Sequence, residues 1–156
     1  MLKNITIKEL LEKAIAKEIE SQKLYRGLGR RVADGAARDA CRDLTREEKH
    51  HQDVLEQYQR REIWEGALNP GKTADYRIAE HFYQPTVSRN MKLEDIFLLA
   101  ANREKASHEF YASFAALHPA GKMKMLIEDL AAQELAHKHR VETLYTEVAF
   151  PQTDGG

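Results

Sequence analysis

The sequence has very few of the residues that build disulfide frameworks and thiolate metal sites. Its 156 residues include one cysteine, Cys41, which excludes an intrachain disulfide and any paired-cysteine metal or redox motif. We expect Cys41 to act as a small buried apolar residue. The low content of proline (4) and glycine (8), beside 42% apolar residues, is typical of a soluble helical protein.

Neither a long apolar run nor an excess of one charge sign is present. No stretch approaches the roughly 20 apolar residues that span a bilayer, and residues 1–11 lack the apolar centre of a signal peptide. With 24 basic and 25 acidic side chains the formal net charge is −1, so nothing attracts the chain to nucleic acid or to an anionic membrane. We therefore expect a cytoplasmic protein with no nucleic-acid or membrane partner.

Hydrophobic periodicity predicts a single all-α domain of four long helices. Thr6 and Glu9 form a possible capping box for the first helix, Asp34-Gly35 interrupts the chain, and His118-Pro119-Ala120-Gly121 makes a turn before the last helix. Two helical hairpins joined by a long crossover favour a ferritin-like bundle over a simple up-and-down one. The predicted helices cover about residues 6–32, 37–63, 93–117 and 123–149, the crossover covers 64–92 with one short helix near 76–82, and the tail 151–156 is expected to fray.

The two halves of the sequence are related by a shift of 86 residues. Between residues 14 and 56, ten positions carry the same residue as the position 86 further along, without a gap. Because chance pairing gives several-fold fewer identities, we interpret the chain as internally duplicated. The pairs are Ala14/Ala100, Glu18/Glu104, Ser21/Ser107, Tyr25/Tyr111, Gly35/Gly121, Asp43/Asp129, Leu44/Leu130, Glu48/Glu134, His51/His137 and Glu56/Glu142.

Each predicted helix places a carboxylate within its inward-facing stripe. Glu48 and His51 interrupt the apolar stripe of the second helix, and their repeat mates interrupt that of the fourth. Four buried carboxylates are prohibitively unfavourable without compensation, but two divalent cations neutralise them, and neutral imidazoles complete the ligand set without adding charge. The predicted metal ligands are Glu18, Glu48, His51, Glu104, Glu134 and His137.

This donor set indicates which metal the centre takes. Mixed carboxylate and imidazole ligation suits iron or manganese, permits zinc, and is rare for calcium and magnesium. One Glu from each of two helices, with Glu-x-x-His from each of the other two, is the pattern of ferritin-like di-iron proteins. We expect two iron ions per chain, which manganese or zinc could replace. Glu48 and Glu134 would bridge them, with Glu18 and His51 on one ion and Glu104 and His137 on the other.

An alternative register exists, because Glu47-x-x-His50 matches the same short motif one residue earlier. Such pairs are common on charged helices, so the motif alone is weak evidence of a site. The shift of 86 residues selects Glu48 and His51, since only this pair has an identical mate in the second half.

Several other residues are candidates for support of the centre. Tyr25 and Tyr111 lie two turns after the first-helix and third-helix glutamates, where they could donate hydrogen bonds to ligand carboxylates, quench stray oxidants, or serve as core aromatics. Glu47 and Gln133 are candidate outer partners of the histidines, or else face solvent. His108 is interpreted as a hydrogen-bonded core histidine rather than an extra ligand. We place His50, His81, His118 and His139 on the surface, and expect Trp64, Tyr76, Phe82 and Tyr83 to pack over the bundle or a dimer interface.

Over residues 6–149 the sequence resembles the rubrerythrin family. The resemblance rests on a Glu followed seven residues later by Tyr in two helices, Glu18 to Tyr25 and Glu104 to Tyr111, and on Glu48-Lys-His-His51 and Glu134-Leu-Ala-His137. It implies a di-iron site that reduces hydrogen peroxide, or reacts with dioxygen, while Fe(II) is oxidised. It also implies a homodimer.

The sequence departs from that family at two points. Typical members carry a rubredoxin domain with four cysteine ligands, whereas this chain has one cysteine and would need an external electron donor such as a rubredoxin-like protein. Typical members also have a glutamate where this chain has Ser107, which favours a six-ligand site of the bacterioferritin type.

The predicted function is therefore a di-iron peroxidase or oxidase in oxidative-stress protection, with a ferroxidase or iron-storage protein as the alternative. A helical interaction protein without metal is a third reading, which the buried carboxylates disfavour.

Overall fold

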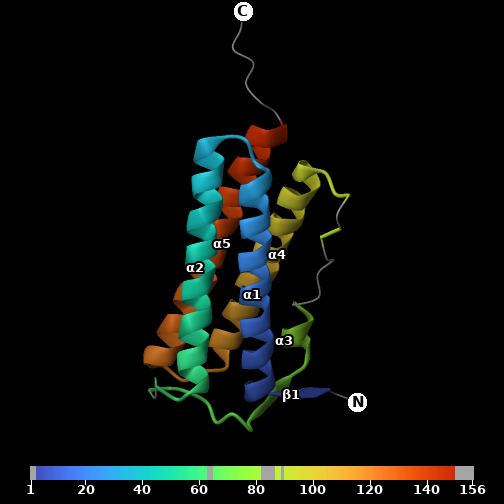
Figure 1. Ribbon diagram of the computed structural model, residues 1–156. Coiled ribbons are helices and arrows are strands. Elements are labelled where there is room, and N and C mark those ends of the chain that lie inside the picture. Colours follow the sequence, from blue (N-terminus) through green and yellow to red (C-terminus); the bar gives the residue numbers. More distant parts are fainter. Residues whose placement is uncertain (1–2, 63–64, 82–86, 89, 150–156) are drawn as a thin grey trace, which may run out of the picture.

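A computed structural model describes residues 3–62, 65–81, 87–88 and 90–149 as a four-helix bundle (Figure 1). Helix α1 packs along α2 and α4 packs along α5, so the molecule is built from the two predicted hairpins. The predicted all-α architecture is confirmed. The elements in chain order are β1 (Asn4–Thr6), α1 (Ile7–Arg31), α2 (Gly35–Gln59), β2 (Thr73–Asp75), α3 (Arg77–Glu80), α4 (Leu93–Ala116) and α5 (Lys122–Ala149).

The helix ends follow local capping chemistry. The predicted capping box is present, because the Glu9 amide donates to the Thr6 hydroxyl at 3.1 Å and the Thr6 amide donates to Glu9 Oε2 at 3.0 Å. Asp34 caps α2 by accepting from the Ala37 amide at 2.9 Å, so this helix begins two residues earlier than predicted. It also ends earlier, at Gln59, and Arg61 lies in the left-handed region with φ of 58°.

A small antiparallel sheet, which the sequence analysis did not predict, ties the N-terminus to the crossover. Asn4, Ile5 and Thr6 pair with Asp75, Ala74 and Thr73. The bond from the Ile7 amide to the Lys72 carbonyl, at 2.9 Å, extends this attachment into α1. Each strand has three residues, too few for an alternating pattern to stand out in the sequence.

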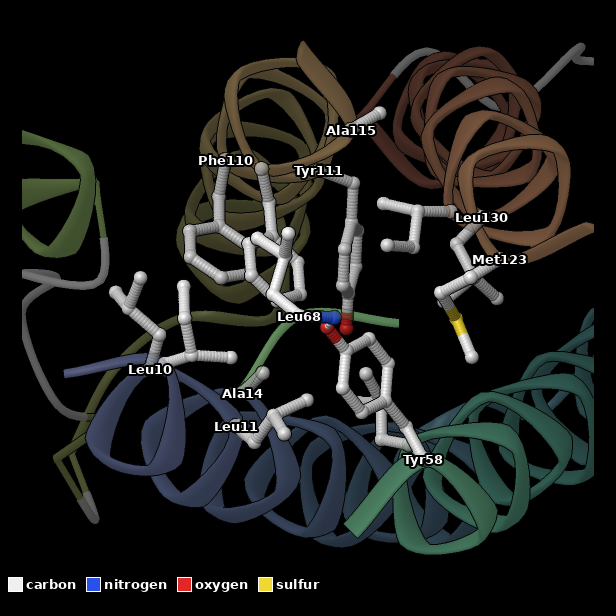
Figure 2. Packing of buried hydrophobic residues seen from close by; sticks show 14 of the residues in the cluster. Leu10, Leu11, Ala14, Tyr58, Leu68, Phe110, Tyr111, Ala115, Met123 and Leu130 are labelled. Atoms are coloured by element: carbon white, nitrogen blue, oxygen red, sulfur yellow. Dashed lines mark hydrogen bonds between the residues drawn. The ribbon is translucent and has the colours of Figure 1, made fainter. Parts of the chain in front are cut away.

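Two apolar clusters fill the bundle, one toward each end. Figure 2 shows the cluster that lies on the side of the N-terminus, with Leu10, Tyr58, Phe110 and Met123 converging from four helices. The second cluster contains Leu28, Leu44, Phe97 and Val141 among others. On every long helix the predicted metal ligands fall between residues of the first cluster and residues of the second, so they form a polar layer across the middle of the core.

His118 was placed on the surface from the sequence, and this prediction is wrong. Its side chain is buried, with Nδ1 donating to the Phe114 carbonyl at 2.8 Å and Nε2 accepting from the Tyr58 hydroxyl at 2.8 Å. The Tyr58 oxygen in turn accepts from the Leu68 amide at 2.9 Å. A histidine next to a turn looks exposed in sequence, but the crossover folds back over this end of the bundle and covers it.

The remaining predictions for these side chains have mixed outcomes. Cys41 is buried and free, as expected. Among the other histidines placed on the surface, His50 and His139 are exposed, whereas His81 is half-buried with Nδ1 3.5 Å from Glu109 Oε2. Tyr76 packs against the first apolar cluster. Trp64, Phe82, Tyr83 and the tail 151–156 lie outside the described residues. Within the described part of the chain, no helix is both long and apolar enough to cross a membrane.

Candidate metal centre

The six predicted ligands meet in the polar layer between the two apolar clusters. Their donor atoms form two groups of four, and within each group all four atoms lie within 4.8 Å of one another. Glu48 and Glu134 belong to both groups, the arrangement expected of bridging carboxylates. The first group adds Glu18 and His51, and the second adds Glu104 and His137.

Both histidines turn Nδ1 toward this cluster. His51 Nδ1 lies 2.7 Å from Glu134 Oε1 and 3.7 Å from Glu18 Oε2. His137 Nδ1 lies 2.6 Å from Glu48 Oε1 and 3.7 Å from Glu104 Oε2. The two rings are stacked, with centroids 5.5 Å apart. Nδ1 is therefore the nitrogen through which each imidazole could bind a metal.

One oxygen of every cluster carboxylate is buried without a hydrogen-bond partner. These atoms are Oε2 of Glu18, Glu48, Glu104 and Glu134. Such a group costs about 1–3 kcal/mol when neutral and more when charged, so four of them at one place require an explanation. Divalent cations bound here would satisfy these oxygens and neutralise the carboxylates. The residues present fit a bimetallic group.

Burial and mutual contact divide the four carboxyls into two kinds. Burial alone would raise the pKa of Glu18 and of Glu104, but Glu18 is stabilised as the anion by Glu48 and His51, and Glu104 by Glu134 and His137, and both pKa values fall to about 2. Burial, followed by the charges of neighbouring glutamates, raises the pKa of Glu48 and of Glu134 well above the usual range. Neighbouring groups thus shift the pKa values of the two pairs of carboxyls in opposite directions.

The tyrosines predicted as supporting residues contact the cluster directly. The Tyr25 hydroxyl donates to Glu104 Oε1 and the Tyr111 hydroxyl donates to Glu18 Oε1, each at 2.5 Å. Both tyrosines are buried, at 1% and 0% exposure. Each therefore binds the carboxylate of the opposite hairpin. Tyr25 belongs to the second apolar cluster and Tyr111 to the first, so the two bonds hold Glu104 and Glu18 from opposite ends of the bundle.

The outer nitrogens of the histidines also have partners in the opposite hairpin. His51 Nε2 lies 2.7 Å from Gln133 Oε1, and His137 Nε2 lies 3.2 Å from Glu47 Oε2. The two residues predicted as candidate outer partners hold these positions, although both are otherwise exposed. A partner at Nε2 holds the ring in place and would leave Nδ1 as the nitrogen that faces a bound metal ion.

Two further residues that the sequence left open make hydrogen bonds to backbone carbonyls. The Ser107 hydroxyl donates to the Arg103 carbonyl on its own helix at 2.8 Å. His108 is half-buried and its Nδ1 lies 2.7 Å from the Ala131 carbonyl oxygen, as expected of a hydrogen-bonded histidine. The centre is thus limited to the six residues named above within the described part of the chain.

Two buried cations beside the centre were not predicted from the sequence. Lys17 and Arg103, at 5% and 9% exposure, directly precede Glu18 and Glu104. Lys17 helps to lower the pKa of both of these glutamates. A signal for them was present, because the two basic residues are 86 positions apart and are therefore mates in the internal repeat.

Comparison with known proteins agrees with this geometry. A family model described as Rubrerythrin matches residues 9–145. A hypothetical protein from Pyrococcus furiosus has 22% identity and a TM-score of 0.71, with 96% of this chain and 94% of that one covered. A Thermotoga maritima protein, whose name assigns it to the ferritin-like diiron-carboxylate proteins, has 16% identity and a TM-score of 0.73 over 95% of this chain and 99% of its own. The predicted ferritin-like fold is confirmed. A search of curated proteins gives no match.

Proposed function

This chain belongs to the rubrerythrin family, and from that premise we propose that it is a di-iron oxidoreductase that reduces hydrogen peroxide or dioxygen and protects against oxidative stress. The observation that carries the proposal is the buried cluster of four glutamates and two histidines, in which four carboxylate oxygens lack partners. Two bound ferrous ions would supply two electrons in all, the number that converts one peroxide and two protons into two water molecules.

The protein's own residues would hold and shield the metals. Glu48 and Glu134 are positioned between the two groups, while Glu18 with His51 and Glu104 with His137 complete one group each. Tyr25 and Tyr111 restrain two of these carboxylates by hydrogen bonds. The apolar clusters above and below the layer limit the access of water, which strengthens the electrostatic interactions inside and suppresses side reactions.

We also propose that the electrons come from a separate acidic protein that carries a one-electron redox centre, such as a rubredoxin-like protein. A groove of about 530 Å³ between α1 and α2 supports this, because six of its lining residues are basic and Tyr25 is in its wall. Tyr25 leads directly to Glu104 of the cluster. The basic groove is defined by Arg26, Arg30, Arg38, Arg42, Arg46 and Lys49.

The charge of this groove is only partly balanced within the chain. Arg42, Arg46 and Lys49 have carboxylate neighbours on α2, at 3.7, 3.8 and 2.9 Å. These three pairs are largely exposed, so each leaves most of its charge available to a partner. A partner protein with an acidic surface would therefore be attracted to this face, and its redox centre would then lie close to the metal cluster.

A second function is favoured by Ser107. Because its hydroxyl donates to the backbone of its own helix and this position does not supply a fifth carboxylate, the centre has the six-residue composition of a bacterioferritin-type ferroxidase. In that case oxidation of Fe(II) would serve iron storage or handling. The assembly distinguishes the two functions, since storage needs a large hollow shell, whereas we expect the oxidoreductase to be a homodimer.

The test is anaerobic reconstitution with Fe(II), followed by separate stopped-flow mixing with hydrogen peroxide and with dioxygen. Faster oxidation by peroxide, in a protein whose mass in solution is that of a dimer, supports the peroxidase. Faster oxidation by dioxygen in a large assembly supports storage. Bound iron that reacts with neither oxidant would refute both functions.

A further inference from the structure

The two halves of the metal cluster are nearly equivalent in their inner contacts. The two tyrosine–glutamate bonds are both 2.5 Å long, and the two histidine–glutamate contacts are 2.7 and 2.6 Å. Every residue in these contacts has an identical repeat mate 86 positions away. From the inner contacts alone, the two metal positions would bind their ions with similar strength.

This equivalence ends at the outer nitrogens of the two histidines. His51 Nε2 contacts the amide oxygen of Gln133, whereas His137 Nε2 contacts the carboxylate of Glu47. Residues 47 and 133 are themselves repeat mates, so one position holds a neutral acceptor where its mate holds an anion. At this pair of positions the two halves differ by one functional group, an amide against a carboxylate.

A second difference keeps the Glu47 carboxylate in place. Arg140 Nη1 lies 3.4 Å from Glu47 Oε2, and Nη2 of the same side chain lies 3.1 Å from Asp43 Oδ2. The repeat mate of Arg140 is Val54, which has no charge. Arg140 is 37% exposed, so solvent screens its charge and it orients Glu47 without cancelling the effect of that carboxylate on His137.

We propose that the two metal positions have unequal affinities, and that the position formed by Glu104 and His137 binds the first ion. A histidine ring whose N–H is bound by a carboxylate is more basic at its other nitrogen, and so a stronger ligand. The Gln133 contact is a hydrogen bond of 2.7 Å, whereas Glu47 Oε2 lies 3.2 Å from His137 Nε2 as an ion-pair contact, so the negative charge of the carboxylate, rather than a shorter bond, strengthens the His137 ring as a ligand. The inference rests on the proposed bimetallic function and adds an order of loading.

The test is an anaerobic titration of the metal-free protein with Co²⁺. The visible absorption of bound Co²⁺ reports metal binding without any turnover. Wild type should fill in two steps whose affinities differ by about 10-fold, the lower end of what outer partners of metal-bound histidines contribute. E47Q gives both histidines an amide partner, and Q133E gives both a carboxylate. Each variant should lower the ratio of the two affinities by about 10-fold, Q133E by strengthening the weaker step.

The control is E62Q, which makes the same chemical change at an exposed glutamate paired with Arg60 on the surface. It should leave the ratio unchanged. Circular dichroism of each variant establishes that the helices are intact, and Q133E provides a second reading should E47Q fold poorly. Equal affinities in wild type would overturn the inference, as would a ratio that neither E47Q nor Q133E changes. Failure of the proposed function looks different, since Co²⁺ would then not bind, or loaded iron would react with neither oxidant.

Discussion

The hydroxyl of Tyr25 donates to Oε1 of Glu104 across the bundle, at 2.5 Å, rather than to Glu18 on its own helix. Tyr111 makes the mirrored bond to Glu18. The two hairpins are thus joined through the polar layer by reciprocal contacts, and this layer both holds the candidate metal ligands and links the halves of the fold. The contacts explain how buried carboxylates keep fixed positions between two apolar clusters.

Replacing Tyr25 by phenylalanine should weaken the fold of the metal-free protein. The substitution leaves a buried carboxylate oxygen of Glu104 without its donor, which costs about 1–3 kcal/mol of the free energy of unfolding. Urea denaturation in the presence of a chelator measures this change. Y145F is the matched control, because Tyr145 is a half-buried tyrosine packed against the second apolar cluster. If both variants unfold at the same urea concentration as wild type, the bond to Glu104 does not contribute to the free energy of unfolding.

Single substitutions of the glutamates should differ in how many metals they remove. Glu48 is in both donor groups, so E48A should remove both ions. Glu18 is only in the first group, so E18A should retain the ion held by Glu104 and His137. Metal analysis after anaerobic loading and desalting gives the numbers, with E12A, an exposed glutamate of α1, as control. Equal losses in E18A and E48A would show that Glu48 does not bridge.

The stability of the fold should depend on the titration of His118. Burial lowers the pKa of this histidine, and its Nε2 accepts a hydrogen bond from Tyr58, which a protonated ring could not do. A folded pKa below the unfolded value of 6.5 means that the unfolded chain binds more protons as pH falls. The contribution is therefore complete above pH 6.5 and is lost as pH decreases through the folded pKa.

This pH effect can be isolated with H118Q. The free energy of unfolding of the metal-free wild type should fall more steeply than that of H118Q between about pH 7.5 and pH 5.5, since the other titrating groups are common to both. Urea denaturation at each pH gives the difference. Parallel curves for the two proteins would mean that the pKa of His118 is the same in the folded and unfolded chains.

Charge reversal in the basic groove should slow electron delivery. With R30E and R38E combined, the rate at which reduced rubredoxin re-reduces the oxidised metal centre should fall by about 10-fold or more at low salt, and should lose its dependence on ionic strength. Dithionite, a small reductant, should act on both proteins at equal rates. The control is K8E with K13E, the same change of charge at the opposite end of α1. A matching loss in that control would place the donor elsewhere.

Much of the centre could be predicted because its residues obey helical periodicity and the internal repeat. The spacing of Glu48 and His51, and the shift of 86 residues to Glu134 and His137, place these side chains on inward faces without any knowledge of neighbouring helices. The crossing of Tyr25 to Glu104 could not be predicted in this way. It depends on how the hairpins are offset along the bundle axis, which periodicity within one helix does not specify.

The errors have the same origin in long-range contact. The paired residues of strands β1 and β2 are 67 to 71 positions apart along the chain, and only their pairing defines the strands. His118 is buried where the crossover covers the end of the bundle. Tyr58 of α2 links it by hydrogen bonds to Leu68 of the crossover, and neither residue is near His118 in sequence. The spacing of apolar residues indicates which face of a helix is buried. A segment from elsewhere in the chain that covers a side chain produces no such spacing in the sequence.

Counting iron shows whether the buried cluster of glutamates and histidines binds a pair of metal ions. Wild-type protein loaded with Fe(II) without oxygen and then desalted should retain about two iron ions per chain, and the double variant E48Q/E134Q, if helical by circular dichroism, should retain almost none. Iron retained equally by both proteins, or absent from wild type, would mean that the cluster is not a metal centre.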